Sequence, residues 1–138
     1  MLRNDRAERI EVGRRGSLDL RRGYYVYIGS AFGPGGVRAR LSRHWHGGAV
    51  RRWHVDYLRA ATIPVAAWCS YASIRLEHRW ACALETAGRF VPIAGFGCSD
   101  CDCRTHLYFC ARSPRRLDRL LPVAGCTIMA CRLGRPGA

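Results

Sequence analysis

The sequence predicts an α+β fold in which a small antiparallel sheet is flanked by helices. Short runs of β-branched and aromatic residues predict strands, and segments whose apolar residues recur every three or four positions predict helices. The order in which these segments follow one another is that of an α+β fold. The chain has 138 residues, 49% of them hydrophobic, which suits one core, so we expect residues 1–138 to form a single domain.

The strongest strand prediction covers residues 24–28. Aromatic and β-branched residues fill this run, and glycine stands on both sides of it, which is typical of a strand. Because successive side chains of a strand point to opposite faces, Tyr25 and Tyr27 share one face. Val26 and Ile28 share the other.

The segment before this strand carries weaker signals. Residues 1–9 are polar and charged, and we expect them to be frayed, as chain ends often are. Two short strands are predicted at residues 10–12 and 17–20, with a glycine-bounded turn between them.

A helix is predicted after the glycine-rich turn that follows residue 28. Val37, Leu41 and Trp45 are spaced four residues apart, as in a helical stripe that faces a core. Arg40 and His44 are also four residues apart, so we expect them to project together from one edge of that stripe. A Gly-Gly pair then ends the helix.

The rest of the chain alternates between helices and strands. A helix over 74–87 has an apolar stripe that includes Leu76, Trp80 and Leu84, with Glu77 beside it, and Ser113 is predicted to cap a later helix that has Pro114 at its first position. The remaining predicted elements are a short helix within 51–61, a buried strand at 65–72, a loop at 95–106, a strand at 107–111, a short helix at 113–121 and a final strand at 126–133.

The charge of the chain indicates an anionic partner. Its formal net charge is +13, and all 23 residues counted as lysine or arginine are arginine. A GC-rich genome would explain the lack of lysine, but it would not explain the excess of cations over anions. Such an excess attracts phosphate polymers, and guanidinium groups bind phosphate oxygens in pairs. We therefore expect nucleic acid as the partner, in preference to an anionic membrane surface or a protein.

The sequence also bears on the compartment. No apolar run approaches the roughly 20 residues that span a bilayer, and the start, MLRNDRAERIEVG, lacks the apolar stretch of a secretory signal. Eight cysteines without such a signal are more consistent with reduced thiols than with a disulfide framework. We therefore expect a cytoplasmic protein without a membrane partner.

Four motifs follow one another along the chain. They are YVYIGSAFGPGGVRARLSRH at 25–44, WHVDYL at 53–58, LEHRWA at 76–81 and GFGCSDCDCRTHLYF at 95–109. On these motifs the sequence resembles the GIY-YIG nuclease superfamily. More closely, it resembles an uncharacterised GIY-YIG-like branch that occurs alone or fused to the base-excision enzyme endonuclease III. The resemblance implies a GIY-YIG-like fold, DNA endonuclease activity, a connection to DNA repair and a repair enzyme as a candidate partner.

One signature of the superfamily has no match in this chain. Its first motif, GIY or a variant, lies on a strand upstream of YIG and supplies another tyrosine of the active site. Gly23, Tyr24 and Tyr25 stand too close to Tyr27 to be that element. We therefore expect the chain to begin after the first strand, either because the start codon was misplaced or because this copy has lost a strand and a catalytic tyrosine. In both cases we expect the strand at 24–28 to lack one of its ladder partners.

The resemblance implies roles for four catalytic residues. Tyr27 would orient or help to deprotonate the attacking water, and Arg40 would bind the scissile phosphate through its planar fork of donors. His44 would relay a proton or hold the phosphate. Glu77 would hold one Mg²⁺, a cation that often needs only one or two protein carboxylates. Contacts to nucleic acid are further expected from Ser30, Arg38 and Arg43.

Two other groups of residues are candidates for roles near the site. His54 and Asp56 in WHVDYL would orient the site by hydrogen bonds, and a buried structural use of His54 is the alternative. The loop at 98–106 contains three thiols and one imidazole, enough donors for a tetrahedral zinc. Its spacing is more compressed than in a zinc ribbon, so we favour a loop packed near the cleft over a zinc site and over redox chemistry. The cluster consists of Cys98, Cys101, Cys103 and His106.

The sequence thus predicts an Mg²⁺-dependent endonuclease that acts on DNA. The first alternative is a catalytically degenerate nucleic-acid-binding module, accessory to a repair enzyme. The second alternative is a protein-interaction domain whose arginines reflect codon usage alone.

Overall fold

The strands pair in antiparallel fashion and helices pack beside them, as the α+β prediction requires. The computed structural model describes residues 1–48, 50–97, 102–121 and 129–132. The described strands are β1 (Leu2–Asn4), β2 (Glu8–Glu11), β3 (Ser17–Leu20), β4 (Gly23–Tyr27), β5 (Ile63–Pro64), β6 (Ala66–Cys69), β7 (Val91–Pro92), β8 (Leu107–Cys110) and β9 (Met129–Arg132). The described helices are the 3₁₀ helix η1 (Gly13–Arg15) and the α-helices α1 (Gly36–His46), α2 (His54–Ala61), α3 (Glu77–Thr86) and α4 (Leu117–Leu120).

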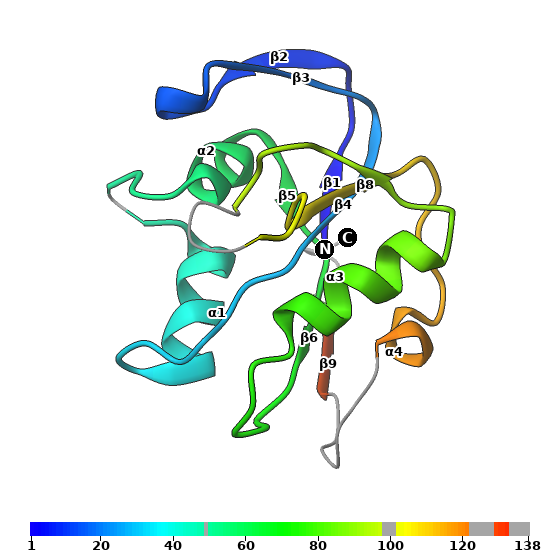
Figure 1. The fold of residues 1–138 in the computed structure, drawn as a ribbon. Coiled ribbons are helices and arrows are strands. Elements are labelled where there is room, and N and C mark those ends of the chain that lie inside the picture. The colour runs from blue at the N-terminus through cyan, green and yellow to red at the C-terminus, as the bar shows by residue number, and fades with distance from the viewer. Residues whose placement is uncertain (49, 98–101, 122–128, 133–138) are drawn as a thin grey trace, which may run out of the picture.

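The main sheet has five strands in the order β5-β1-β4-β8-β7, and every neighbouring pair is antiparallel. Two smaller antiparallel pairs, β2 with β3 and β6 with β9, stand beside it (Figure 1). Each small pair lacks the strands it would need to be stable alone. The prediction of an α+β fold with a small antiparallel sheet is confirmed.

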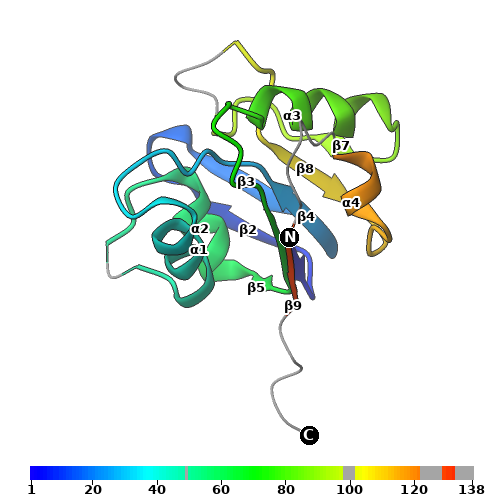
Figure 2. The ribbon, with the colours of Figure 1, turned by 90° about the horizontal axis from the view of Figure 1, so that it is seen from below.

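Helices cover both faces of the sheet. Figure 2 shows α1 and α2 on one side of the sheet and α3 and α4 on the other. Tyr25 belongs to the core shared with α2 and the β2–β3 pair, and Tyr27 packs against that core. Val26 and Ile28 belong to the second core, which contains residues of α3 and α4. The two-residue alternation predicted for this strand is confirmed.

The expectation that residues 1–9 are frayed is wrong. Leu2 is buried and lies opposite Tyr25 in the β1–β4 ladder. Asn4 is also buried, and its side-chain amide donates to the carbonyl of Arg21 at 3.1 Å. The sequence Leu-Arg-Asn lacks an apolar run, so β1 is ordered by its neighbours on both sides and not by its own propensity.

The expectation that the strand at 24–28 lacks a ladder partner is wrong for the same reason. β4 pairs with β8 from Tyr24 to Tyr27 and with β1 from Gly23 to Tyr25, so both of its edges have a ladder partner, and the one with β1 ends at Tyr25. The strand beside it, however, carries Leu2, Arg3 and Asn4 and no tyrosine.

The helix predicted after the glycine-rich turn is confirmed as α1. It follows Gly35, whose φ of 80° lies in the left-handed region, where glycine has no steric penalty. None of its residues is fully buried. Its stripe of Val37, Leu41 and Trp45 lines a pocket, whereas the periodicity predicted a core-facing stripe.

Two helices begin later than predicted. α3 begins at Glu77, after an exposed stretch in which Ile74 is 44% exposed, although Leu76 directly before the helix is buried. α4 is limited to four residues, since Arg116 before it has a φ of 54° that interrupts a right-handed helix. Ser113 and Pro114 therefore do not cap it. None of the helices in the described ranges is both long and apolar enough to cross a bilayer.

Gly23 allows β4 to approach β8 closely. It has a φ of 149°, and a Cβ there would lie 2.7 Å from the Phe109 ring and 2.9 Å from the carbonyl of Cys110. We predict that Gly23→Ala lowers the free energy of unfolding by about 2 to 4 kcal/mol, through backbone strain and overpacking together.

The matched control is Gly16→Ala. Gly16 has a φ of 84°, but no atom lies within 4 Å of the position that a Cβ would take there, so only the backbone effect remains, about 1 kcal/mol. Urea unfolding of both variants gives the comparison. Equal losses for the two variants would contradict a steric constraint between β4 and β8.

Candidate functional site

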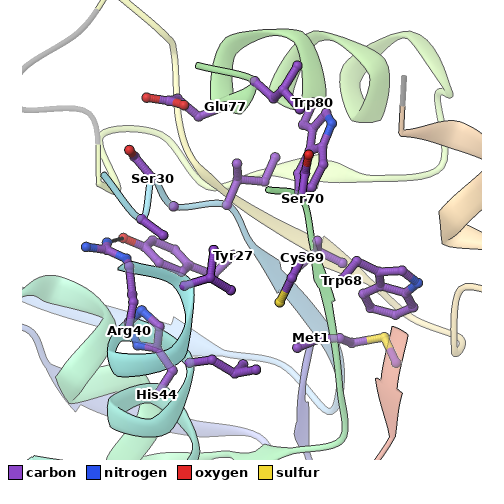
Figure 3. Close-up of a pocket in the computed structure, with 18 of the residues that line it drawn as sticks. Met1, Tyr27, Ser30, Arg40, His44, Trp68, Cys69, Ser70, Glu77 and Trp80 are labelled. Carbon is purple, nitrogen blue, oxygen red and sulfur yellow. Dashed lines mark hydrogen bonds between the residues drawn. The ribbon is translucent and has the colours of Figure 1, made fainter. Parts of the chain in front are cut away.

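A pocket of about 380 Å³ opens at the end of β4, between α1 and the first turn of α3. β6 and the residues after it form another wall, and the lining is mostly apolar. Figure 3 shows side chains from α1 and α3 facing this pocket from opposite sides. The structure brings five of the sequence-predicted residues into its lining, namely Tyr27, Ser30, Arg40, His44 and Glu77.

Tyr27 is the last residue of β4 and is half-buried. Its phenol oxygen accepts a hydrogen bond from Nη2 of Arg40 at 3.5 Å. Its ring meets the edges of His44 and Phe96, with centroid separations of 5.8 and 6.3 Å. Because the strand ends here and three side chains surround the ring, the phenol is held in one orientation at the pocket wall.

Two glycines provide the space around this tyrosine. A Cβ at Gly29 would lie 3.1 Å from the Tyr27 ring and 3.0 Å from Nη2 of Arg40. A Cβ at Gly97 would lie 3.2 Å from the other side of the ring. The glycine of YIG is thus required by close packing and not by an unusual backbone conformation.

Arg40 is half-buried on α1 and is oriented by two aromatic side chains. Besides its contact with Tyr27, its guanidinium lies 4.9 Å from the ring centroid of Trp53, a cation–π arrangement. Its Nε is buried and has no hydrogen-bond partner among the described residues. A buried donor without a partner costs free energy, so this guanidinium is suited to an incoming acceptor.

His44 lies one turn after Arg40 and is neutral at physiological pH. Burial lowers the pKa of its imidazole to about 4, and the positive charge of Arg40 adds to this effect. Both ring nitrogens are buried, and neither has a hydrogen-bond partner within the described ranges. A neutral ring can accept or donate one hydrogen bond, but it does not supply a positive charge to a phosphate.

Glu77 is the first residue of α3 and is only 8% exposed. Nη1 of Arg75 lies 3.6 Å from its carboxylate, on a side chain that is itself largely exposed. Burying a carboxylate is unfavourable unless a cation or donors compensate it. The helix N-terminus favours a negative charge at this position, and a bound cation would favour it further.

Arg43 and Asp56 form an ion pair at 2.7 Å between α1 and α2. Asp56 also accepts from the backbone amides of Arg52 and Trp53, at 2.8 and 3.0 Å, as a residue in the first turn of a helix does. Burial alone would raise the pKa of the Asp56 carboxyl, but the bonds from Arg43 and the two amides lower it overall. Asp56 therefore connects α2 to α1, and the guanidinium of Arg43 is engaged within the protein.

α2 also fixes the end of α1 through Arg59. Its guanidinium donates to the carbonyls of His44 and Trp45, at 2.8 and 2.7 Å, and to the carbonyl of Thr62 at 2.9 Å. Terminal carbonyls of a helix have no partner within the helix, so Arg59 supplies them with donors. His54, in contrast, packs its ring on Phe96 with a centroid separation of 5.6 Å and is not part of the pocket lining.

The comparison with protein families gave one match. Residues 1–125 match the model of the family described as Domain of unknown function DUF123. The chain belongs to this family. No curated protein and no solved structure matched the chain. The geometry of the pocket in this DUF123 domain is therefore the main evidence for its chemistry.

Sequence reasoning missed three exposed aromatic side chains near the site of the DUF123 domain. Trp53 is 44% exposed and stacks on Arg40 and Arg43. Phe32 and Tyr71, at the rim of the pocket, are 53% and 64% exposed. A signal in the sequence was available at Trp53, which directly follows two arginines. Arginine and aromatic side chains near one another are typical of nucleic-acid-binding surfaces, because both groups stack on nucleobases.

The predicted cysteine and histidine cluster is described only in part. Cys98 and Cys101 lie outside the described residues. Cys103 and His106 are described, and His78 of α3, which the sequence pattern did not indicate, lies with them. Arg38 is exposed on α1 and is not part of the pocket lining.

The low pKa of His44 predicts a pH effect on stability. The folded-state pKa, about 4, lies below the ordinary value of 6.5, so the fold favours the neutral ring. This contribution is complete above pH 6.5 and is lost as the pH falls toward 4. At about 1.4 kcal/mol per pH unit, it amounts to roughly 2 to 3 kcal/mol.

The test compares the wild type with His44→Leu, which cannot titrate at this position. Urea unfolding at pH 7, 6, 5 and 4.5 should show the wild type losing stability faster, by roughly 2 kcal/mol over this interval. His46→Leu is the control, because His46 is exposed on the same helix. Parallel pH profiles for wild type and His44→Leu would contradict a buried neutral imidazole.

Proposed function

We propose that this DUF123 domain is an endonuclease of the GIY-YIG type that hydrolyses phosphodiester bonds in DNA with the help of Mg²⁺. The observation that carries the proposal is that Tyr27, Arg40 and Glu77, which come from three different elements, line one pocket. A phenol, a guanidinium and a buried carboxylate provide the groups that this hydrolysis needs: a donor and acceptor for water, a cation for the phosphate and a metal ligand.

The charge and the exposed aromatic rings support a nucleic-acid substrate. The net charge of +13 attracts a polyanion, and Phe32 and Tyr71 at the pocket rim offer faces on which bases stack. Ser30, which also lines the pocket, can donate to a phosphate oxygen. Arg38, which is exposed on α1, would contact the backbone further along the DNA.

Arg40 has the role of phosphate ligand. Its guanidinium is held by Tyr27 and Trp53, while its Nε has no acceptor among the residues described. A phosphate oxygen would satisfy that donor. As negative charge increases on the phosphate in the transition state, the same guanidinium becomes more stabilising, which accelerates the reaction.

Tyr27 has the role of orienting the attacking water. Its phenol lies at the pocket wall with Arg40 as hydrogen-bond donor, so the phenol can hold a water beside the phosphate that the same arginine binds. Positioning of this kind lowers the activation free energy, because the entropy cost of bringing water and phosphate together in the reactive orientation is met on binding. His44, being neutral, can accept a hydrogen bond next to these groups.

Glu77 fits the role of metal ligand. It is a buried carboxylate in the pocket wall, and its ion pair with the exposed Arg75 is long, at 3.6 Å. Mg²⁺ keeps several waters and needs only one or two carboxylates from the protein. When bound, Mg²⁺ would offset negative charge on the phosphate and on the leaving oxygen.

One observation favours a second candidate function, a catalytically degenerate nucleic-acid-binding module accessory to a repair enzyme. β1, the strand beside β4, has Leu2, Arg3 and Asn4 where the superfamily places another tyrosine of the active site. Such a module would keep the net positive charge of the chain and a salt-dependent affinity for nucleic acid but would not cleave DNA.

We predict that Arg40→Ala and Glu77→Gln each lower Mg²⁺-dependent nicking of supercoiled plasmid at least tenfold, without loss of fold. Losing one preorganised charge at the phosphate typically costs more than this factor. The controls are Arg14→Ala, which removes an equal charge from the exposed η1, and Glu85→Gln, which changes an exposed carboxylate on the same helix α3.

The same assay separates the two candidates. Wild-type protein that binds plasmid with steep salt dependence but does not nick it with Mg²⁺ would favour the binding module. Nicking that survives unchanged in both Arg40→Ala and Glu77→Gln would remove the pocket from the reaction.

Gly29 provides a test of the packing around the site. We predict that Gly29→Ala lowers nicking roughly tenfold, because its methyl group displaces the guanidinium of Arg40 and the ring of Tyr27 by a few tenths of an ångström. Gly33→Ala is the matched control, since no atom lies within 4 Å of a Cβ there. Equal activity of the two variants would contradict the need for this close packing.

A further inference from the structure

Three side chains outside the pocket lining bring metal-binding donors together. His78 lies on the first turn of α3, and Cys103 and His106 lie in the segment before β8. The ligand atoms of these three residues are all within 4.8 Å of one another. Nδ1 of His78 is 2.8 Å from Sγ of Cys103, and the rings of His78 and His106 are 6.2 Å apart at their centroids.

We propose that His78, Cys103 and His106 bind a zinc ion. Two imidazoles and one thiolate are ligands that Zn²⁺ prefers, whereas Mg²⁺ and Ca²⁺ prefer oxygen. With Zn–N near 2.0 Å and Zn–S near 2.3 Å, tetrahedral ligands lie about 3.3 to 3.7 Å from one another. The ligand atoms observed here are separated by distances from 2.8 Å, between His78 and Cys103, to at most 4.8 Å. These values lie on both sides of that interval, so rotations of the side chains suffice to form the site. The fourth position is available to water or to a further donor.

The buried side of this site is rigid. His106 is 7% exposed, its amide donates to the carbonyl of Phe96 at 2.8 Å, and its carbonyl accepts from the amide of Ile28 at 2.9 Å. Its backbone is therefore fixed to the loop on one side and to the end of β4 on the other. His78, in contrast, is exposed. A fixed ligand and a movable one allow the ion to enter from solvent and then close the site.

The zinc site joins two segments that carry residues of the pocket. Its α3 ligand, His78, directly follows Glu77. Its other ligands precede β8, and the Cβ of His106 lies 3.4 Å from the position of a Cβ on Gly97, the glycine that contacts Tyr27. The ion would thus fix the first turn of α3 to the loop behind Tyr27. Its role in this position is structural, and its ligands differ from the carboxylate proposed for Mg²⁺.

Elemental analysis of the full chain, purified without a histidine tag, tests the site. We expect one zinc per chain, and a thiolate-to-metal charge-transfer band after replacement by Co²⁺. His78→Ala and Cys103→Ala should each weaken Zn²⁺ affinity at least tenfold in a chelator competition. His46→Ala and Cys82→Ala, which change an exposed histidine on α1 and an exposed cysteine on α3, should retain the wild-type affinity.

A second measurement separates a metal ligand from a residue that merely supports folding. Removal of zinc should lower the Tm of the wild type and of both controls, and it should lower the Tm of His78→Ala less, because that variant binds zinc more weakly. Far-UV circular dichroism reports the fold of each variant. Substoichiometric zinc with no Co²⁺ charge-transfer band would overturn the proposal. So would wild-type affinity in both His78→Ala and Cys103→Ala with loss of binding in Cys98→Ala or Cys101→Ala.

Discussion

The position of α1 depends on the guanidinium of Arg59. This helix carries Arg40 and His44, yet none of its residues is fully buried, so apolar burial contributes less to its position than to that of α2 or α3. Arg59 instead donates to two carbonyls at the end of α1, and the ion pair of Arg43 with Asp56 adds a second polar connection. Both connections begin on α2, whose Val55 and Leu58 lie in the core. The core thus fixes α2, and α2 in turn fixes α1 in the pocket wall through these hydrogen bonds and this ion pair.

β4 contributes residues both to the core and to the pocket. Tyr25 and Val26 are buried on opposite faces, which fixes the strand in the middle of the molecule. Tyr27, the last residue of the strand, still pairs with Leu107 of β8, whereas the ladder with β1 extends only to Tyr25. Of the polar side chains that line the pocket with it, Arg40 and His44 come from α1 and Glu77 from α3, on the two sides of the sheet. The pocket therefore depends on the sandwich of helix, sheet and helix as a whole.

Apolar periodicity and strand propensity predicted β4, α1, α3 and β8, although the stripe of α1 lines the pocket and not the core. The prediction failed for elements whose secondary structure is determined by tertiary contacts and not by their own sequence. β1 has no apolar run, and its order comes from Leu2 and Asn4 between two neighbouring strands. The two-residue strands β5 and β7 both contain proline, which is a weak strand signal. The grouping of Tyr27, Arg40 and Glu77 was anticipated from motifs. His78 was not, because only the folded chain brings an exposed position of α3 next to Cys103.

The attachment of α1 through its backbone has an evolutionary consequence. A carbonyl oxygen accepts the same hydrogen bond whatever side chain its residue carries. Arg59 donates to two backbone carbonyls of α1. Amino-acid substitutions at the outward-facing positions of this helix therefore leave these two hydrogen bonds intact. During evolution, side chains on the surface of α1 can therefore be exchanged, and the binding preference of the pocket can change with them. The position of the helix stays the same, because Arg59 binds its backbone.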